Sequence, residues 1–191
     1  MNRSFLFLAE GFEEVEALTV VDVMRRAGMD IKTISISNNK EVRGAHGVPV
    51  VADQLFSETE FDAPEWLIVP GGMPGSSNLA AFAPLNDLLK KQAAEGRKIA
   101  AICAAPALVL APLGLLDGVE ATCYPGMESH LDHAIAVPTR VVALDKIITG
   151  NGPASALQFA LAIVANSMGE SQAQTIGSDM LFYNDTTEKY Y

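Results

Sequence analysis

Short continuous runs of apolar residues alternate along the chain with stretches in which apolar residues recur every three or four positions. Such runs are typical of strands buried on both faces, and the recurring spacing is typical of amphipathic helices. The runs predict strands over Phe5–Ala9, Ile31–Ile36, Trp66–Val69, Lys98–Ile102, Ala121–Cys123 and Lys146–Thr149, and a short strand or hairpin arm over Val48–Val51. The periodic stretches predict helices over Glu16–Ala27, Leu85–Glu95, Ala107–Leu113, Ser155–Met168 and Ser171–Phe182.

This alternation predicts a single α/β domain over residues 1–191, with a mostly parallel central sheet and helices on both of its faces. In such folds, ligands bind at the carboxyl ends of the strands. Three predicted loops fall there: the loop after Ala9, the loop after Val69, and the one that holds Cys103. The polar tail, Asn184–Tyr191, is expected to be loosely held.

Composition and charge narrow the possible functions. The 191 residues are 49% hydrophobic and 19% charged, which suits one globular domain with a large core. The net charge of -10 argues against a nucleic-acid partner, because phosphates need a basic face. No apolar run approaches the roughly 20 residues that span a bilayer, so no membrane partner is expected. Glu10 and Glu13 follow the first apolar run directly, so we interpret that run as a strand rather than a signal peptide and expect a cytoplasmic protein.

Metal and disulfide signatures are weak. Two cysteines, Cys103 and Cys123, are too few for a disulfide framework. No Cys/His cluster has zinc-ligand spacing; His130 and His133 are three residues apart without further ligands, and His46 stands alone. We therefore expect neither a metal ion nor a cofactor.

Cys103 stands at the corner between a predicted buried strand and a predicted helix, and small residues flank it. This is the layout of a nucleophile elbow, in which small neighbours let the backbone bend sharply and expose the side chain. The following helix would direct N–H groups at the sulfur and favour the thiolate. The alternative is a buried cysteine that acts as a small apolar residue. The strand–cysteine–helix context favours the reactive interpretation.

Two further loops have candidate chemistry. Acidic residues in a first helical turn are usually solvated, which explains Glu13 and Glu14, but Glu16 lies beside the apolar stripe and could be a desolvated carboxyl that hydrogen-bonds a thiolate. The glycines of Pro70–Gly75 could aim backbone N–H groups at an oxyanion or form an ordinary tight turn. This segment lacks the lysine of a P-loop. Asn151–Pro153 is a weaker candidate.

Taken together, these segments resemble the ThiJ/PfpI superfamily, whose domain is class I glutamine amidotransferase-like, and within it the branch of the Parkinsonism-associated protein deglycase. The matching motifs lie at residues 8–16, 21–28, 70–72, 100–104 and 152–153. The resemblance extends from Phe5 to about Tyr183. It implies a flavodoxin-like three-layer sandwich and a homodimer.

The resemblance also implies roles for individual residues. Cys103 matches the reactive cysteine, Glu16 the glutamate that hydrogen-bonds it, and Gly72 and Ala104 the positions whose N–H groups form an oxyanion pocket. Five further residues are implied to line the site: Gly71, Pro153, Tyr124, His46 and Arg26. His46 stands where the branch has a basic residue, and Arg26 matches an arginine near the site at the dimer contact.

Two departures from the family pattern bear on the function. Tyr124 stands where methylglyoxal-detoxifying members often carry histidine, although some bacterial relatives have an aromatic residue there. Protease-like members carry histidine where this chain has Ala104, so a protease is disfavoured.

Two functional classes remain open. One is a glyoxalase or deglycase acting on 2-oxoaldehydes or their protein adducts, in which the thiolate forms a hemithioacetal and Glu16 moves a proton between carbons. The other is a non-enzymatic oxidative-stress sensor or chaperone whose Cys103 is oxidised to sulfinate. The expected partners are small reactive aldehydes or glycated side chains, and a second copy of the chain.

Overall fold

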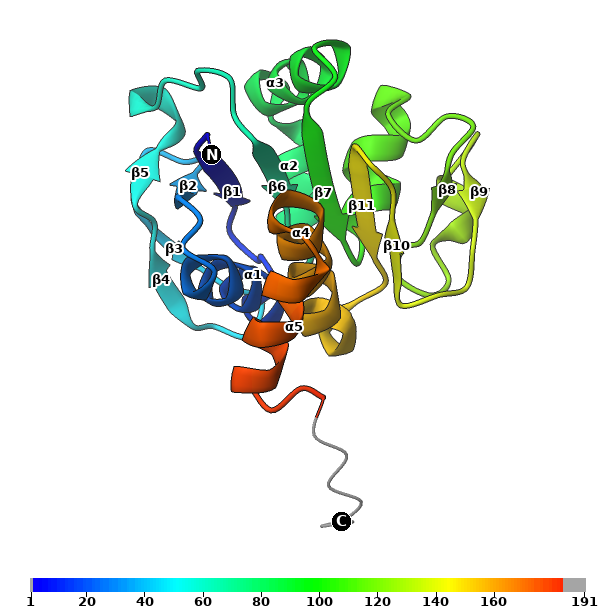
Figure 1. The fold of residues 1–191 in the computed structure, drawn as a ribbon. Helices are drawn as coiled ribbons and strands as arrows, with labels where there is room; N and C mark the ends of the chain where they lie inside the picture. The colour runs from blue at the N-terminus through cyan, green and yellow to red at the C-terminus, as the bar shows by residue number, and fades with distance from the viewer. Residues whose placement is uncertain (1, 184–191) are drawn as a thin grey trace.

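The computed structural model describes residues 2–183 and confirms an α/β sandwich with a mostly parallel central sheet (Figure 1). Its seven strands follow the order β10-β11-β7-β6-β1-β2-β5, and β10 alone among them pairs antiparallel. They are β1 (Ser4–Leu8), β2 (Ile31–Ser35), β5 (Gln54–Leu55), β6 (Trp66–Val69), β7 (Lys98–Ile102), β10 (Val141–Ala143) and β11 (Ile147–Gly150). Two small pairs lie outside it, the hairpin β3 (Glu41–Arg43)–β4 (Pro49–Val51) and the parallel pair β8 (Glu120–Ala121)–β9 (Ile135–Ala136).

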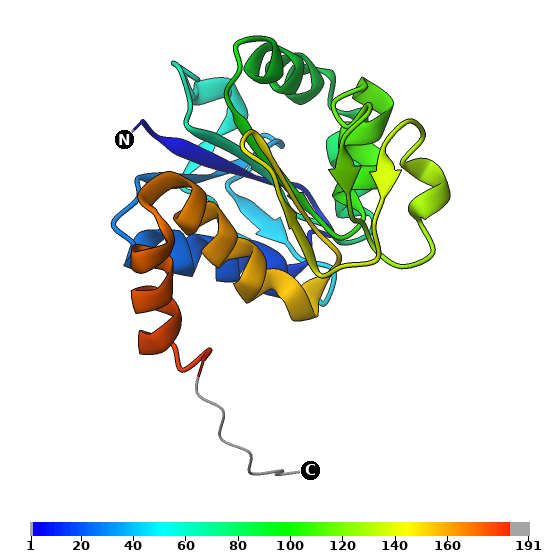
Figure 2. The same cartoon turned by 45° about the vertical axis from the view of Figure 1, so that its right-hand side comes forward.

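Helices cover both faces of the sheet. They are α1 (Glu14–Arg26), α2 (Gly75–Ala81), α3 (Ala83–Ala94), α4 (Ala156–Met168) and α5 (Glu170–Asp179). Short 3₁₀ turns span Phe56–Glu58, Ala111–Leu113, Glu128–His130 and Pro153–Ser155, and a π-helical turn spans Pro106–Leu110. In Figure 2 the blue and orange helices α1, α4 and α5 lie on one side of the sheet, and the green helices lie on the other. Among residues 2–183, no helix combines the length and apolarity needed to cross a membrane.

The continuous apolar runs reflect burial of the strands on both faces. In β1, Leu6 and Leu8 pack in the core that includes α1 and α4. Phe5 and Phe7 point to the opposite core, which includes Leu85 of α3. Successive side chains of a strand point to opposite faces, so a strand between two helical layers has no polar side.

Three sequence predictions were wrong in detail. The helix expected over Ala107–Leu113 is a π turn followed by a 3₁₀ turn, and Pro112, which has no N–H to donate, cannot continue an α-helix there. Helix α2 was missed because its Gly-Ser-Ser-Asn start has low helix propensity. Cys123 lies beyond β8 rather than in a strand, because the Thr122 N–H donates to the side chain of Thr149.

The other helices and strands differ by a few residues from the predicted limits. The hairpin arm expected over Val48–Val51 is β4, whereas the short strands β3, β5, β9 and β10 were not predicted. The polar tail lies outside the described residues. Strands β1, β6 and β7 are adjacent in the sheet and parallel, so the three loops expected to carry ligands meet at one edge.

Candidate functional site

Cys103 occupies a backbone conformation that residues other than glycine rarely adopt. It follows β7 directly and has a φ of 65°. Its N–H donates to the Gly150 carbonyl at 2.8 Å, and its carbonyl accepts from the Tyr124 N–H at 2.8 Å. These two bonds hold a left-handed corner that costs on the order of 1–3 kcal/mol and is typical of functional sites. The corner has the geometry of a nucleophile elbow.

Glu16 brings a carboxyl to this corner from the first turns of α1. The side chain is fully buried, and Oε2 accepts a hydrogen bond from the Gly71 N–H at 2.7 Å. The thiol of Cys103 lies within hydrogen-bonding reach of the same carboxyl. The other oxygen, Oε1, has no N–H or O–H donor among residues 2–183. The carboxyl and the thiol therefore form one buried acidic pair.

Two glycines after β6 permit this contact. A Cβ atom at Gly71 would lie 2.5 Å from the Cβ of Cys103 and 2.6 Å from Oε2 of Glu16, so a side chain there would separate the pair. Gly72 has a φ of 92°, and its N–H and that of Ala104 are directed at the sulfur of Cys103. The Pro70–Gly75 loop, which the sequence predicted as a tight turn or an oxyanion site, thus lets Glu16 and Cys103 approach each other. It also supplies one of the two N–H donors to the sulfur.

Burial is the largest cause of the pKa shifts of both Glu16 and Cys103. It raises the pKa of Glu16 to about 7, against the lowering effect of the Gly71 N–H. Burial, followed by the charge of an ionised Glu16, raises the pKa of the Cys103 thiol to about 12, whereas the N–H groups of Gly72 and Ala104 lower it. The sequence predicted a thiolate stabilised by a helix, but only a short π turn follows the cysteine. The segment after the cysteine therefore stabilises a thiolate through the single N–H of Ala104 rather than through a full α-helix.

The donors around the two groups decide which one holds the shared proton near neutral pH. A thiolate would accept from the Gly72 and Ala104 N–H groups and from a protonated Glu16, which makes three donors. A carboxylate would accept from the Gly71 N–H and from a thiol, which is a weak donor. Hydrogen bonds to a charged group are the stronger ones. We infer that the proton rests on Glu16. Loss of this proton would leave a charged carboxylate, and that charge raises the pKa of the Cys103 thiol.

A cavity of about 760 Å³ opens over the sulfur. Its lining residues are Glu13, Val15, His46, Gly72, Met73, Cys103, Ala104, Tyr124, Met127 and Pro153. The lining combines apolar side chains with the phenol of Tyr124, which is half exposed. A small carbonyl compound, or one attached to a larger body, fits a space of this size.

The structure gathers most of the residues that the sequence singled out. Cys103, Glu16, Gly71, Gly72 and Ala104 are in contact around the sulfur. Tyr124, His46 and Pro153 line the cavity above it. Sequence reasoning missed Val15, Met73 and Met127 and assigned Glu13 to a solvated first turn. Only Met73, inside the glycine-rich loop, carried a local signal.

Arg26 does not reach this site within its own chain. It lies ten residues after Glu16 on α1, or about 15 Å along the helix axis. Its Nε pairs with Asp22 at 2.8 Å on an exposed surface. The expectation of an arginine near Cys103 is therefore not met by the single chain.

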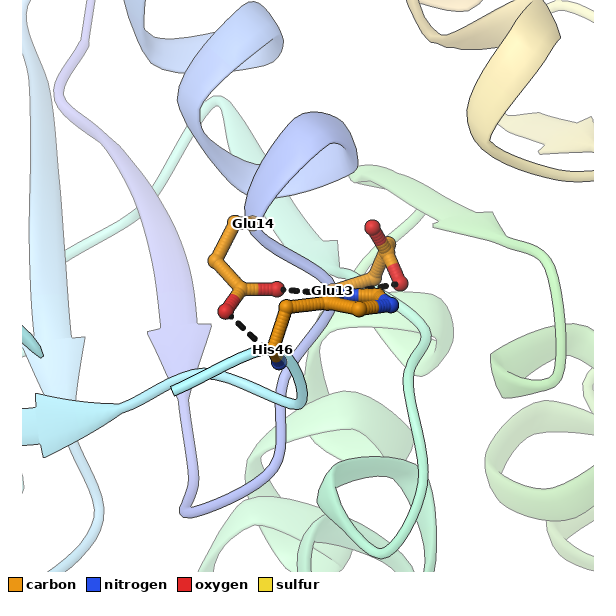
Figure 3. A group of neighbouring side chains, drawn as sticks. All are labelled: Glu13, Glu14 and His46. Carbon is orange, nitrogen blue, oxygen red and sulfur yellow. Dashed lines mark hydrogen bonds and ion pairs between the residues drawn. The ribbon is translucent and has the colours of Figure 1, made fainter. Parts of the chain in front are cut away.

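His46 reaches the cavity from the turn between β3 and β4 (Figure 3). Its Nδ1 lies 2.9 Å from Oε2 of Glu14 and 3.7 Å from Oε2 of Glu13. The hydrogen bond to Glu14 raises the pKa of His46. Oε1 of Glu14 in turn accepts the backbone N–H groups of His46 and Val48, so this carboxylate fastens the hairpin to α1.

Comparison with known proteins identifies relatives over nearly the whole chain. Residues 2–166 match the sequence profile of the DJ-1/PfpI family. The chain is 37% identical to "Protein DJ-1 homolog B" of Arabidopsis thaliana over 96% of its own length and 42% of that protein. It is 31% identical to the "Glutathione-independent glyoxalase DJR-1.2" of Caenorhabditis elegans, over 87% of this chain and 89% of the relative. The solved structure of "Toxoplasma gondii DJ-1, oxidized" superimposes with a TM-score of 0.91 at 36% identity, covering 96% of this chain and 100% of that one.

The relatives differ in length. The chain spans less than half the length of the two Arabidopsis homologues that it matches, 42% of one and 47% of the other. It covers nearly all of the C. elegans glyoxalase. The shared part is therefore the unit that holds the Cys103 site.

The raised pKa of Glu16 predicts a pH-dependent stability. A carboxyl whose pKa rises from 4.5 to about 7 on folding stabilises the fold fully below pH 4.5, and this contribution, about 3 kcal/mol, is lost as the pH rises through 7. Glu16→Gln removes the carboxyl and, with it, this contribution. Urea unfolding at pH 4.5, 6 and 8 should show the parent losing stability relative to Glu16→Gln as the pH rises; a constant difference would mean that Glu16 is not buried as an acid.

The shared proton predicts the effect of Glu16 on the thiol. Glu16→Leu removes a donor to the thiolate and should raise the pKa of Cys103 by roughly one unit, because a charge-assisted hydrogen bond contributes about 1.5–3 kcal/mol and solvent replaces part of it. Glu16→Gln keeps a donor and should change the pKa less. Thiolate absorbance in the ultraviolet, in a Cys123→Ser background, measures both. An unchanged or lower pKa in Glu16→Leu would show that the carboxyl is ionised or out of reach.

Proposed function

The chain belongs to the DJ-1/PfpI family, and we propose that it is a cysteine-dependent enzyme that acts on 2-oxoaldehydes or their protein adducts. The observation that carries this proposal is the buried pair of Cys103 and Glu16 beneath an open cavity. A nucleophile beside a carboxyl whose pKa is near neutrality is what an internal proton transfer needs. The glyoxalase name of the C. elegans relative supports the substrate class.

The proposed reaction uses the shared proton. The sulfur of Cys103 attacks the aldehyde carbon, and the proton on Glu16 moves to the new oxygen to complete a hemithioacetal. The N–H groups of Gly72 and Ala104 lie where they can stabilise the developing negative charge. Glu16, now a carboxylate, takes the hydrogen of the former aldehyde carbon as a proton and returns it to the neighbouring carbon, while the hydroxyl proton on the first oxygen passes to the second oxygen.

The product of this shift is a thioester of a 2-hydroxy acid. Water then releases the acid and restores the thiol, so the sequence is an isomerisation followed by hydrolysis and consumes no oxidant or reductant. With a protein adduct, the thiolate would displace the modified amine from the carbon that carries it, and the proton on Glu16 would pass to the departing amine, which leaves the same hemithioacetal and the free side chain. The size of the cavity suits either substrate.

A second role rests on a different observation. The groups that would stabilise an oxyanion, the Gly72 and Ala104 N–H groups and a protonated Glu16, could also bind the oxygens of a cysteine sulfinate. Peroxide would supply the oxidant: two equivalents add two oxygens to the sulfur and leave as water. The T. gondii relative, whose structure is of an oxidized form, supports such chemistry. We disfavour a protease, because Ala104 offers no base where protease-like members carry histidine.

The test separates turnover from oxidation. Cys103→Ser should abolish conversion of methylglyoxal to lactate, and Glu16→Gln should lower kcat at least about 100-fold, the usual contribution of a proton-transfer group. Cys123→Ser is the matched control and should retain activity. Mass spectrometry after mild peroxide runs in parallel. No turnover by the parent protein, together with two oxygen atoms added at Cys103, would reject the enzyme and favour the sensor.

We also propose a cytoplasmic homodimer. Two free thiols suit a reducing compartment. The apolar side chains of Val15 and Leu18 are 51% and 41% exposed on α1, close to the charged residues of the same helix. Such apolar exposure on one helix is typical of an interface.

Sedimentation should give twice the chain mass of 20.3 kDa at micromolar concentration. Leu18→Glu should shift the mass toward one chain, because a carboxylate would be buried without a partner. Ile135→Glu, at an exposed apolar residue of β9, is the control and should leave the mass unchanged. A monomeric parent protein would contradict the dimer.

A further inference from the structure

We propose that Glu13, Glu14 and His46, hereafter the rim cluster, bind a divalent transition-metal ion beside the Cys103 cavity, with Zn²⁺ as the ion they suit best (Figure 3). Their donor atoms all lie within 4.8 Å of one another. Glu13 and His46 line the cavity, and Glu14 adjoins them in the first turn of α1. This proposal does not depend on the proposed aldehyde chemistry.

The spacing of the donors fits a tetrahedral ion. Nitrogen and oxygen ligands bind Zn²⁺ at about 2.0–2.2 Å, so neighbouring ligand atoms lie roughly 3.3–3.6 Å apart. Nδ1 of His46 is 2.9 Å from Oε2 of Glu14 and 3.7 Å from Oε2 of Glu13. The two carboxylates lie within 4.8 Å of each other, so side-chain shifts of up to about one ångström would place all three atoms on one ion. One imidazole and two carboxylates form a donor set that zinc accepts.

Glu14 is held in position as a metal ligand would be. Its Oε1 accepts two backbone N–H groups, from His46 at 2.8 Å and Val48 at 3.3 Å, which fix the carboxylate and leave Oε2 facing the imidazole. Gly44 leaves the room that this carboxylate occupies, because a Cβ atom at residue 44 would lie 2.2 Å from it. Hydrogen bonds that orient a ligating carboxylate are the usual outer shell of a metal site.

The charges also favour a cation. Two carboxylates with a neutral imidazole carry two negative charges, which a divalent ion neutralises. The net charge of -10 on the chain adds a long-range attraction. Mg²⁺ and Ca²⁺ prefer more oxygen ligands than the cluster offers, whereas imidazole suits zinc.

Three protein ligands leave a fourth position on a tetrahedral ion. Because Glu13 and His46 both line the Cys103 cavity, that position would be open to a molecule bound in the cavity. An oxygen atom of such a molecule could then contact the ion while its carbon lies over the sulfur. Open three-ligand sites of this kind are typical of zinc ions that contact substrates.

The alternative is that the rim cluster only fastens the β3–β4 hairpin to α1. His46→Asn distinguishes the two, because the asparagine amide can still donate a hydrogen bond to Glu14 but is a poor zinc ligand. The variant should melt near the temperature of its parent without metal. His130→Asn, at an exposed histidine of the Glu128–His130 turn, is the matched control.

The experiment is a calorimetric titration of the full chain with Zn²⁺ at pH 7.5 in a Cys103→Ser, Cys123→Ser background, which removes thiol ligands. We expect one ion per chain, a loss of affinity of about tenfold or more in His46→Asn and in Glu13→Gln, and no change in His130→Asn. If the background variant does not fold, the same titration of the natural chain should lose one equivalent in His46→Asn. No binding, or binding that His46→Asn leaves unchanged, would overturn the proposal.

Discussion

The Glu16 carboxyl and the Cys103 thiol are buried against each other, and they cannot both be ionised in that position. The pair therefore keeps one proton over a broad range of pH, and the surrounding donors decide where it lies. Every neighbouring element serves this contact. The order β7-β6-β1 brings the two side chains to one sheet edge, and Gly71 lets them approach across the loop after β6.

The geometry that holds Cys103 and Glu16 together lowers the free energy of unfolding, and packing elsewhere in the fold must offset this loss. The left-handed Cys103 and the Oε1 of Glu16, which has no donor among residues 2–183, each disfavour the folded state, the former by on the order of 1–3 kcal/mol. The cores on the two faces of the sheet are dense with fully buried side chains such as Phe7 and Trp66, each of which contributes roughly 1.5–3 kcal/mol. A local strain of this kind is typical where function rather than stability has selected the geometry.

Local pattern was enough to predict the main strands and the elbow. Buried strands appear as apolar runs because both faces are covered, and the elbow appears as a strand that ends at Cys103. The features that could not be predicted depend on contacts between distant residues. His46 meets Glu14 across 32 positions, so no spacing rule reveals the rim cluster. The effect of burial on the thiol depends on distant residues in the same way: neighbouring elements desolvate Cys103 and raise the pKa of its thiol. Cys123 lies outside the strand predicted for it. The N–H of the preceding Thr122 donates to the side chain of Thr149 instead of to the backbone of a neighbouring strand.

The position of the rim cluster gives the cavity two electrostatically different ends. At the sulfur, two backbone N–H groups favour a negative charge. At the rim, Glu13 and Glu14 repel one unless a cation lies between them. A dicarbonyl compound carries two oxygens that become negative in turn as the proton shifts between carbons. In the proposed reaction, the N–H groups would stabilise the oxygen on the carbon attached to sulfur, whereas the neighbouring oxygen would need a positive partner elsewhere. Protonated His46 or a metal ion on the rim cluster would supply that charge, so the occupancy of this cluster would decide how well the second oxygen is stabilised.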